Sequence, residues 1–283
     1  MRSRGPDDGL AFPSHSPAKA QDRRTVLIAG VISALIFLAV MPFAKVQLAE
    51  VRAFIPSYQA ALAIGDLLTA AMLYAHFNAL RSRALLLLAN GYLFTALMAV
   101  IHALTFPGLF APEGLLGAGP QTTAWLYMFW HGGFPIMVIG YGLTKDRDGA
   151  PVTSEAMRST IVASILAVLV AVVVLTLVAT VGSSGLPPIM TGQNYTPVMN
   201  DVVTAVWALS LGAFLVLWLR MPYSVLDLWL MLVMVSWIFD IALAAVLNAG
   251  RFDVGFYAGR IYGLAAGTFV LIVLLFRKTR SPT

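Results

Sequence analysis

The sequence contains no cysteine and few charged residues. Without cysteine the chain can form no disulfide, no thiol nucleophile and no cysteine-bound metal site. Charged residues make up only 11% of the 283 residues, whereas soluble domains carry about 25%. Hydrophobic residues make up 59%. These proportions predict an integral membrane protein rather than a soluble domain.

Several activities are excluded by what else is missing. The four lysines all fall outside the long apolar runs, so no lysine can form a retinal Schiff base inside a membrane. The sequence has no Walker phosphate loop, no GxSxG nucleophile motif and no HExxH metal motif. No segment outside the apolar runs is long enough for a catalytic domain. We therefore expect no enzyme activity and no nucleic-acid partner.

Apolar runs recur along the chain, and each has or approaches the roughly 20 residues that cross about 30 Å of hydrocarbon. We place eight of them, at Thr25–Ala44, Tyr58–Leu80, Ala84–Thr105, Thr122–Leu143, Ser159–Val181, Asp201–Leu219, Ser224–Leu247 and Tyr257–Phe276. The sequence therefore predicts an all-α, polytopic membrane helix bundle with about eight transmembrane helices. Residues 1–24 are predicted to be a disordered cytoplasmic tail, 25–278 the membrane domain, and 279–283 a short second tail.

The basic residues indicate the orientation of the bundle. With eight spans both termini lie on one side, and only four of the 18 basic residues then fall opposite: Lys45, Arg52, Arg251 and Arg260. Because basic residues accumulate on the cytoplasmic side, both termini are predicted to be cytoplasmic. The expected location is the bacterial inner (plasma) membrane, with multiple passes.

Ionisable residues inside the apolar runs are the candidates for function, because a charged group in lipid must be paired or neutral. Counting 1.5 Å per residue places five of them in the outer half of the membrane: Asp66, His102, His131, Asp240 and Arg260. We expect them to surround one polar cavity, with Arg260 paired to Asp240 or Asp66. The alternative is that they only hold helices together. His76 and Asp227 are expected nearer the cytoplasm, as a separate group.

The stretch from Leu97 to Pro135 holds two of these residues, His102 and His131, on either side of a loop rich in glycine and proline. Aromatic residues crowd the second histidine: Trp125, Tyr127, Trp130 and Phe134. Two imidazoles at similar depth predict either metal or haem ligation, with Asp66 or Tyr127 as a third ligand, or hydrogen-bonded histidines lining a polar cavity. Both interpretations stay open on the sequence alone.

Glycine repeats every four residues in the last apolar run, at Gly259, Gly263 and Gly267. Small residues at this spacing let helix backbones approach closely in lipid. The stripe predicts tight packing of the last helix against its neighbours.

Four stretches of the sequence resemble a known family: Phe54–Tyr74, Asn90–Gly108, Thr123–Pro135 and Phe256–Leu275. They include an H-x-x-x-F-P-G element that begins at His102 and a W-x-x-x-x-W-H element that ends at His131. In these elements the chain is similar to the fourth class of bacterial membrane-associated sensor (MASE) domains, over about residues 25–278.

The resemblance implies a sensory input domain that detects a ligand or membrane signal and passes it to a cytoplasmic output module, often a diguanylate cyclase or a histidine kinase. The matching positions are Asp66, Tyr74, His102, Trp125, Trp130, His131, Tyr257, Gly259 and Arg260, to which the residues themselves add Tyr127 and Asp240. The expected partners are the lipid bilayer and a cytoplasmic signalling protein, with a homodimer left open. Two other functions remain as alternatives: a haem- or metal-binding membrane protein, and a small-solute transporter.

Overall fold

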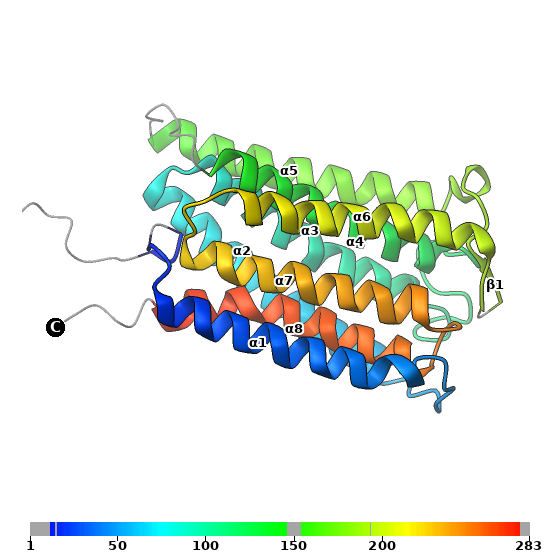
Figure 1. Ribbon diagram of the computed structural model, residues 1–283. Coiled ribbons are helices and arrows are strands. Elements are labelled where there is room, and N and C mark those ends of the chain that lie inside the picture. The colour runs from blue at the N-terminus through cyan, green and yellow to red at the C-terminus, as the bar shows by residue number, and fades with distance from the viewer. Residues whose placement is uncertain (1–11, 15, 146–153, 193, 278–283) are drawn as a thin grey trace, which may run out of the picture.

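The computed structural model describes residues 12–14, 16–145, 154–192 and 194–277. Within these ranges eight long helices run side by side (Figure 1). They are α1 (Ala20–Val40), α2 (Phe54–Leu80), α3 (Arg83–Thr105), α4 (Thr122–Thr144), α5 (Ser154–Ala179), α6 (Pro197–Leu219), α7 (Val225–Ile241) and α8 (Val254–Arg277). The predicted all-α membrane bundle is confirmed, and seven of these helices are long and apolar enough to cross a membrane.

Helix α4 is the one that composition alone would miss. It spans 23 residues, but it carries Trp, Tyr, His, Gly and an internal Pro135 that lower its apolar character. Its neighbours α3, α5 and α6 cover most of its surface, so its polar and aromatic side chains face protein. A span buried in this way has no need of a uniformly apolar surface.

Six helices close into a ring, in which α2 packs on α3, α3 on α4, α4 on α6, α6 on α7, α7 on α8 and α8 back on α2. The other two helices lie outside this ring. Helix α5 packs against α3 and α4, and α1 packs against α7 and α8, on the opposite edge of the bundle (Figure 1). No residue of α1 is buried, whereas α7 is largely buried.

The chain is ordered earlier than the predicted tail of residues 1–24 implies. Helix α1 begins at Ala20 rather than at Thr25, and a short 3₁₀ turn, Met41–Phe43, follows it. The preceding residues pair with the turn before α7, where the Ala18 N–H donates to the Tyr223 carbonyl at 3.0 Å. Residues 1–11 and 279–283, also predicted to be tails, lie outside the described residues.

The end of the bundle opposite the start of α1 and the end of α8 is covered by connecting segments (Figure 1). Between α5 and α6 lie a 3₁₀ turn, Ser183–Gly185, and a hairpin of β1 (Met190–Thr191) and β2 (Asn194–Tyr195). The Gln121 side chain fixes this segment, because its amide accepts from the Met190 N–H at 2.9 Å and donates to the Met190 carbonyl at 2.8 Å. The hairpin is thereby held over the start of α4.

Helix α7 ends in a π-helical segment, Ala242–Leu247. Such wide turns leave backbone carbonyls open to other donors, and they are frequent at functional sites. Here the Tyr195 hydroxyl donates to the Ala244 carbonyl at 2.7 Å. The hairpin and the end of α7 are therefore joined directly.

Candidate functional site

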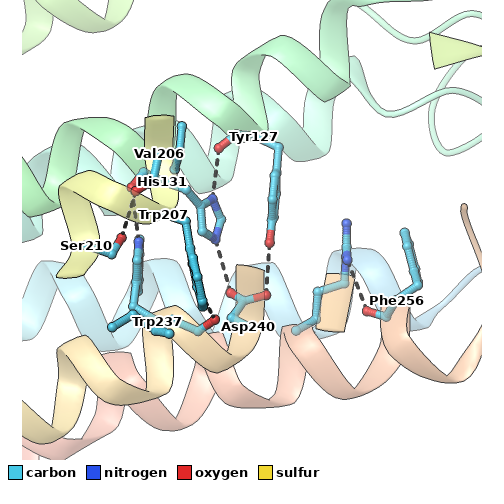
Figure 2. Close-up of polar contacts among 10 residues, drawn as sticks. Tyr127, His131, Val206, Trp207, Ser210, Trp237, Asp240 and Phe256 are labelled. Carbon is cyan, nitrogen blue, oxygen red and sulfur yellow. Dashed lines mark hydrogen bonds and ion pairs between the residues drawn. The ribbon is translucent and has the colours of Figure 1, made fainter. Parts of the chain in front are cut away.

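A buried carboxylate on α7, Asp240, lies at the centre of the polar contacts between α4 and α7 (Figure 2). The Tyr127 hydroxyl donates to its Oδ1 at 2.9 Å, and its Oδ2 lies 3.1 Å from His131 Nε2. The Tyr127 and His131 rings also stack, with centroids 3.7 Å apart. The residues are one turn apart on α4, so a single helix face presents both to the carboxylate.

The second nitrogen of His131 determines the charge of this group. His131 Nδ1 lies 2.8 Å from the Tyr127 carbonyl, which can only accept, so Nδ1 carries a proton. One further proton must then lie between Nε2 and the Asp240 carboxyl. Whichever of the two residues holds that proton, histidine and aspartate together carry no net charge.

The proline in α4 explains another contact of His131. In a regular helix the carbonyl of residue 131 would accept from the N–H of residue 135, but Pro135 has no N–H. The indole N–H of Trp237 on α7 takes that place and donates to the His131 carbonyl at 3.1 Å (Figure 2). The bond satisfies a buried acceptor and ties α4 to α7 at the histidine itself.

The second predicted histidine, His102, lies on the other side of Tyr127 and Trp130 from His131. Its ring centroid is 6.3 Å from Tyr127 and 6.1 Å from Trp130, while Trp130 lies 5.0 Å from His131. The Gln59 amide nitrogen lies 2.6 Å from His102 Nδ1. With Nδ1 accepting from this amide, Nε2 is the donor of the imidazole.

A pocket opens beside these residues, at the end of the bundle covered by the connecting segments. It holds about 340 Å³ of space free of protein atoms, its mouth included. Its lining comes from α3, α4, α6, α8 and the covering segments: His102, Phe106, Thr123, Ala124, Tyr127, Met190, Tyr195, Met199, Arg251, Phe256 and Arg260. No carboxylate is among these lining residues.

Two arginines give the pocket its charge. Arg260 is 6% exposed, and its guanidinium lies 3.6 Å from the Phe256 ring centroid and 5.3 Å from that of Tyr127. Arg251 donates to Thr123 Oγ1 at 2.8 Å, and burial lowers the pKa of its guanidinium. The ion pairs formed by described residues include neither arginine, so the predicted pairing of Arg260 with Asp240 or Asp66 is not formed.

The glycine stripe of α8 lies against the buried carboxylates. A Cβ on Gly263 would come within 2.8 Å of Asp240 Oδ2, and one on Gly259 within 2.9 Å of Asp240 Oδ1. A Cβ on Gly267 would lie 3.0 Å from Asp66 Oδ1. The tight packing predicted for α8 therefore places its backbone directly against Asp240 of α7 and Asp66 of α2.

Six predicted site residues lie outside the pocket lining: Asp66, Trp125, Trp130, His131, Asp240 and Tyr257. Asp66 accepts from the Thr95 hydroxyl at 2.5 Å. The Trp125 indole donates to the Pro187 carbonyl at 3.1 Å, and the Tyr257 hydroxyl to the Ala49 carbonyl at 2.7 Å. The last two contacts fix connecting segments.

Asp227 lies at the other end of the bundle, apart from the pocket as predicted, and a polar group forms around it. Its carboxylate accepts from Lys145 Nζ at 2.7 Å and from the Tyr141 hydroxyl at 2.9 Å. Ser224 caps the start of α7 next to it. The two polar groups are separated by a buried aromatic layer that includes Phe134 and Trp237.

Comparison with protein families gives one match. The family model described as membrane-associated sensor, integral membrane domain (MASE4) matches residues 49–279. The chain belongs to the MASE4 family. The resemblance read from the sequence is thereby confirmed, and α1 lies outside the matched range. Neither the curated proteins nor the solved structures gave a match.

The MASE4 bundle gives no support to a metal shared by the two histidines. Both ring nitrogens of His131 face protein atoms, and Nδ1 of His102 faces Gln59. No group of three or more potential metal ligands occurs among the described residues. Metal or haem ligation by His102 and His131 stays a prediction of the sequence.

Several MASE4 pocket residues were missed by the sequence analysis: Thr123, Met190, Tyr195, Met199, Arg251 and Phe256. Arg251 was counted only as a charge outside the membrane. Tyr195 lies in a connecting segment whose folding over the bundle has no signal in the apolar runs. Burial raises the pKa of the Tyr195 phenol above its usual value of 10.0.

Proposed function

We propose that this MASE4 domain binds a small ligand in the pocket at its external end and transmits the binding event along α8 to a cytoplasmic output module or partner. The observation that carries the proposal is the place of Arg260. It lines the pocket, and it belongs to the helix that ends at Arg277, next to the C-terminus.

The orientation supports this direction of signalling. Fourteen of the 18 basic residues belong to the side of the termini, which favours a cytoplasmic position for that side. The pocket then opens towards the outside of a bacterial inner membrane. The output partner we expect is a diguanylate cyclase or a histidine kinase.

The contacts of α8 supply the coupling. A ligand changes an equilibrium only by binding one state better than the other. Movement of Arg260 towards a ligand would shift the α8 backbone at Gly259 and Gly263, where it touches Asp240. Asp240 in turn contacts His131 and Tyr127 on α4, so two states of this packing can differ in the position of α8.

The experiment is a chimera in which a diguanylate cyclase domain follows Lys278 and cyclic dinucleotide is measured in bacteria. His131→Ala removes the contact with Asp240 and is expected to change the basal output by several-fold. Arg52→Gln is the matched control, because Arg52 is exposed and, among the described residues, forms an ion pair with Glu50 alone. Equal output from the parent, the histidine variant and the control, at equal membrane levels, would overturn the proposal.

A further inference from the structure

The residues that line the pocket include two arginines and no carboxylate. The Asp240 and His131 pair has zero net charge for either position of its shared proton, because His131 Nδ1 is held protonated by the Tyr127 carbonyl. Asp240 is paired with His131, and the ion pairs formed by described residues do not include Arg260. Its guanidinium is stabilised by the faces of Phe256 and Tyr127, which lower the cost of burial without neutralising the charge.

One nitrogen of the Arg260 guanidinium lacks a hydrogen-bond partner among the described residues. Nη1 donates to the Phe256 carbonyl at 3.0 Å. Nε, on the other edge, is buried and has no hydrogen-bond partner among the described residues. A guanidinium edge offers two parallel N–H groups, the fork that a carboxylate matches with its two oxygens.

Other donors surround the same space. Arg251 lines the pocket and donates one of its N–H groups to the Thr123 hydroxyl. His102 lines it too, with Nδ1 occupied by Gln59 and Nε2 left as donor. The Tyr195 hydroxyl gives its proton to the Ala244 carbonyl, so towards the pocket it can only accept.

The remaining walls are apolar. Phe106, Met190, Met199 and Phe256 line the pocket together with Ala124. An inorganic phosphate or sulfate would leave several oxygens against these side chains without donors, which is costly. A carboxylate with a short hydrocarbon tail satisfies both halves of the lining. Only about 30 Å³ of this space can be reached by the centre of a water-sized molecule, so the ligand must be small.

We propose that the pocket is a binding site for a small organic monocarboxylate, held by Arg260 and Arg251 with His102 as a third donor. The proposal rests on the proposed sensory function and names the class of ligand for the same site. Arg260 binds the carboxylate at its Nε edge, and the tail lies among the methionine and phenylalanine side chains.

The test uses the full chain in lipid nanodiscs and sodium butyrate as the probe, with chloride balancing the ionic strength. Butyrate is expected to raise the unfolding temperature saturably, while butyramide, which has the same shape without the charge, leaves it unchanged. Arg260→Gln is expected to weaken butyrate binding at least about tenfold, as loss of a charged hydrogen bond does. Arg52→Gln is the control and keeps the parent affinity.

A second variant covers the case in which Arg260→Gln fails to fold. Arg260→Lys keeps the charge and loses the fork, and it is also expected to weaken butyrate binding about tenfold. Equal stabilisation by butyramide, tighter binding of inorganic phosphate than of butyrate, or parent affinity in both Arg260 variants would each overturn the proposal.

The chimera separates this proposal from the proposed function. Output that responds to His131→Ala in a domain that does not bind butyrate would keep the sensory role and overturn the monocarboxylate. Butyrate binding that depends on Arg260 but never changes the output would keep the site and overturn the sensory role.

Discussion

The stability provided by the hydrogen bond from Trp237 to the His131 carbonyl should depend strongly on Pro135. In the natural chain Trp237→Phe removes the donor that replaces the missing N–H of Pro135. A buried carbonyl left without a partner costs about 1–3 kcal/mol, and interhelical hydrogen bonds in membranes reach about 1.7 kcal/mol. The smaller phenyl ring adds the cost of a cavity.

Pro135→Ala supplies an N–H that can reach the His131 carbonyl within α4. With alanine at position 135, Trp237→Phe should lower the free energy of unfolding by about 1–2 kcal/mol less than it does with Pro135. The carbonyl then keeps a donor, while the cost of the cavity stays the same. Unfolding of the four proteins of this cycle in mixed micelles, followed by circular dichroism, measures the coupling. A change of about 1.4 kcal/mol is tenfold in the ratio of folded to unfolded protein.

The control is Trp229→Phe, because Trp229 packs on the Phe269 ring at 5.9 Å and lies on the same helix. Its cost should be the same with Pro135 and with alanine at that position. If Trp237→Phe is also additive with Pro135→Ala to within about 0.5 kcal/mol, the indole does not substitute for the missing backbone donor, and the reasoning fails.

Three further outcomes follow from the packing and the loop contacts. Gly263→Ala places a methyl group 2.8 Å from the α7 carboxylate and should lower the unfolding temperature by several degrees, whereas Gly212→Ala meets no atom within 4 Å and should be neutral in the same thermal scan. Asp227→Asn removes the countercharge of the Lys145 ammonium, which keeps only neutral acceptors such as the Pro222 carbonyl, and should cost about 3–5 kcal/mol in chemical unfolding, against less than about 1 kcal/mol for Arg52→Gln at the exposed pair. Because the folded pKa of Tyr195 is raised above 10.0, stability should fall as pH rises above that value, and Tyr195→Phe should flatten the decline in alkaline unfolding curves.

The helices could be predicted because their signal is simple. Each apolar run matches the thickness of a bilayer, and even α4, with its low hydropathy, was recovered from its length and from the alternation of basic residues. The start of α1 was placed five residues late, since charged residues such as Arg23 and Arg24 can continue a helix beyond the membrane.

The sequence predicts how deep the candidate residues lie in the membrane, but not which way their side chains face. Residue counting places His131, Asp240 and Arg260 at similar depth, yet it does not give the rotation of each helix about its axis. Asp66 accordingly contacts Thr95 instead of the pocket, and Asp240 contacts histidine instead of arginine.

The residues that come from connecting segments could not be predicted at all. Tyr195 and Arg251 reach the pocket because the segments before α6 and α8 fold back over the bundle. Hydrophobic periodicity describes helices, and it carries no information on such a return of the chain.

The length of helix α8 turns a small tilt at the pocket into a larger displacement at its last turn. From Arg260 to Arg277 it advances about 26 Å at 1.5 Å per residue. A tilt of about 5° around its Arg260 end therefore displaces its Arg277 end by about 2 Å over that length. Displacements of about 1–2 Å are typical of helix shifts at interfaces in switching proteins, so a change no larger than a side-chain adjustment at the pocket suffices to reposition whatever follows the last turn.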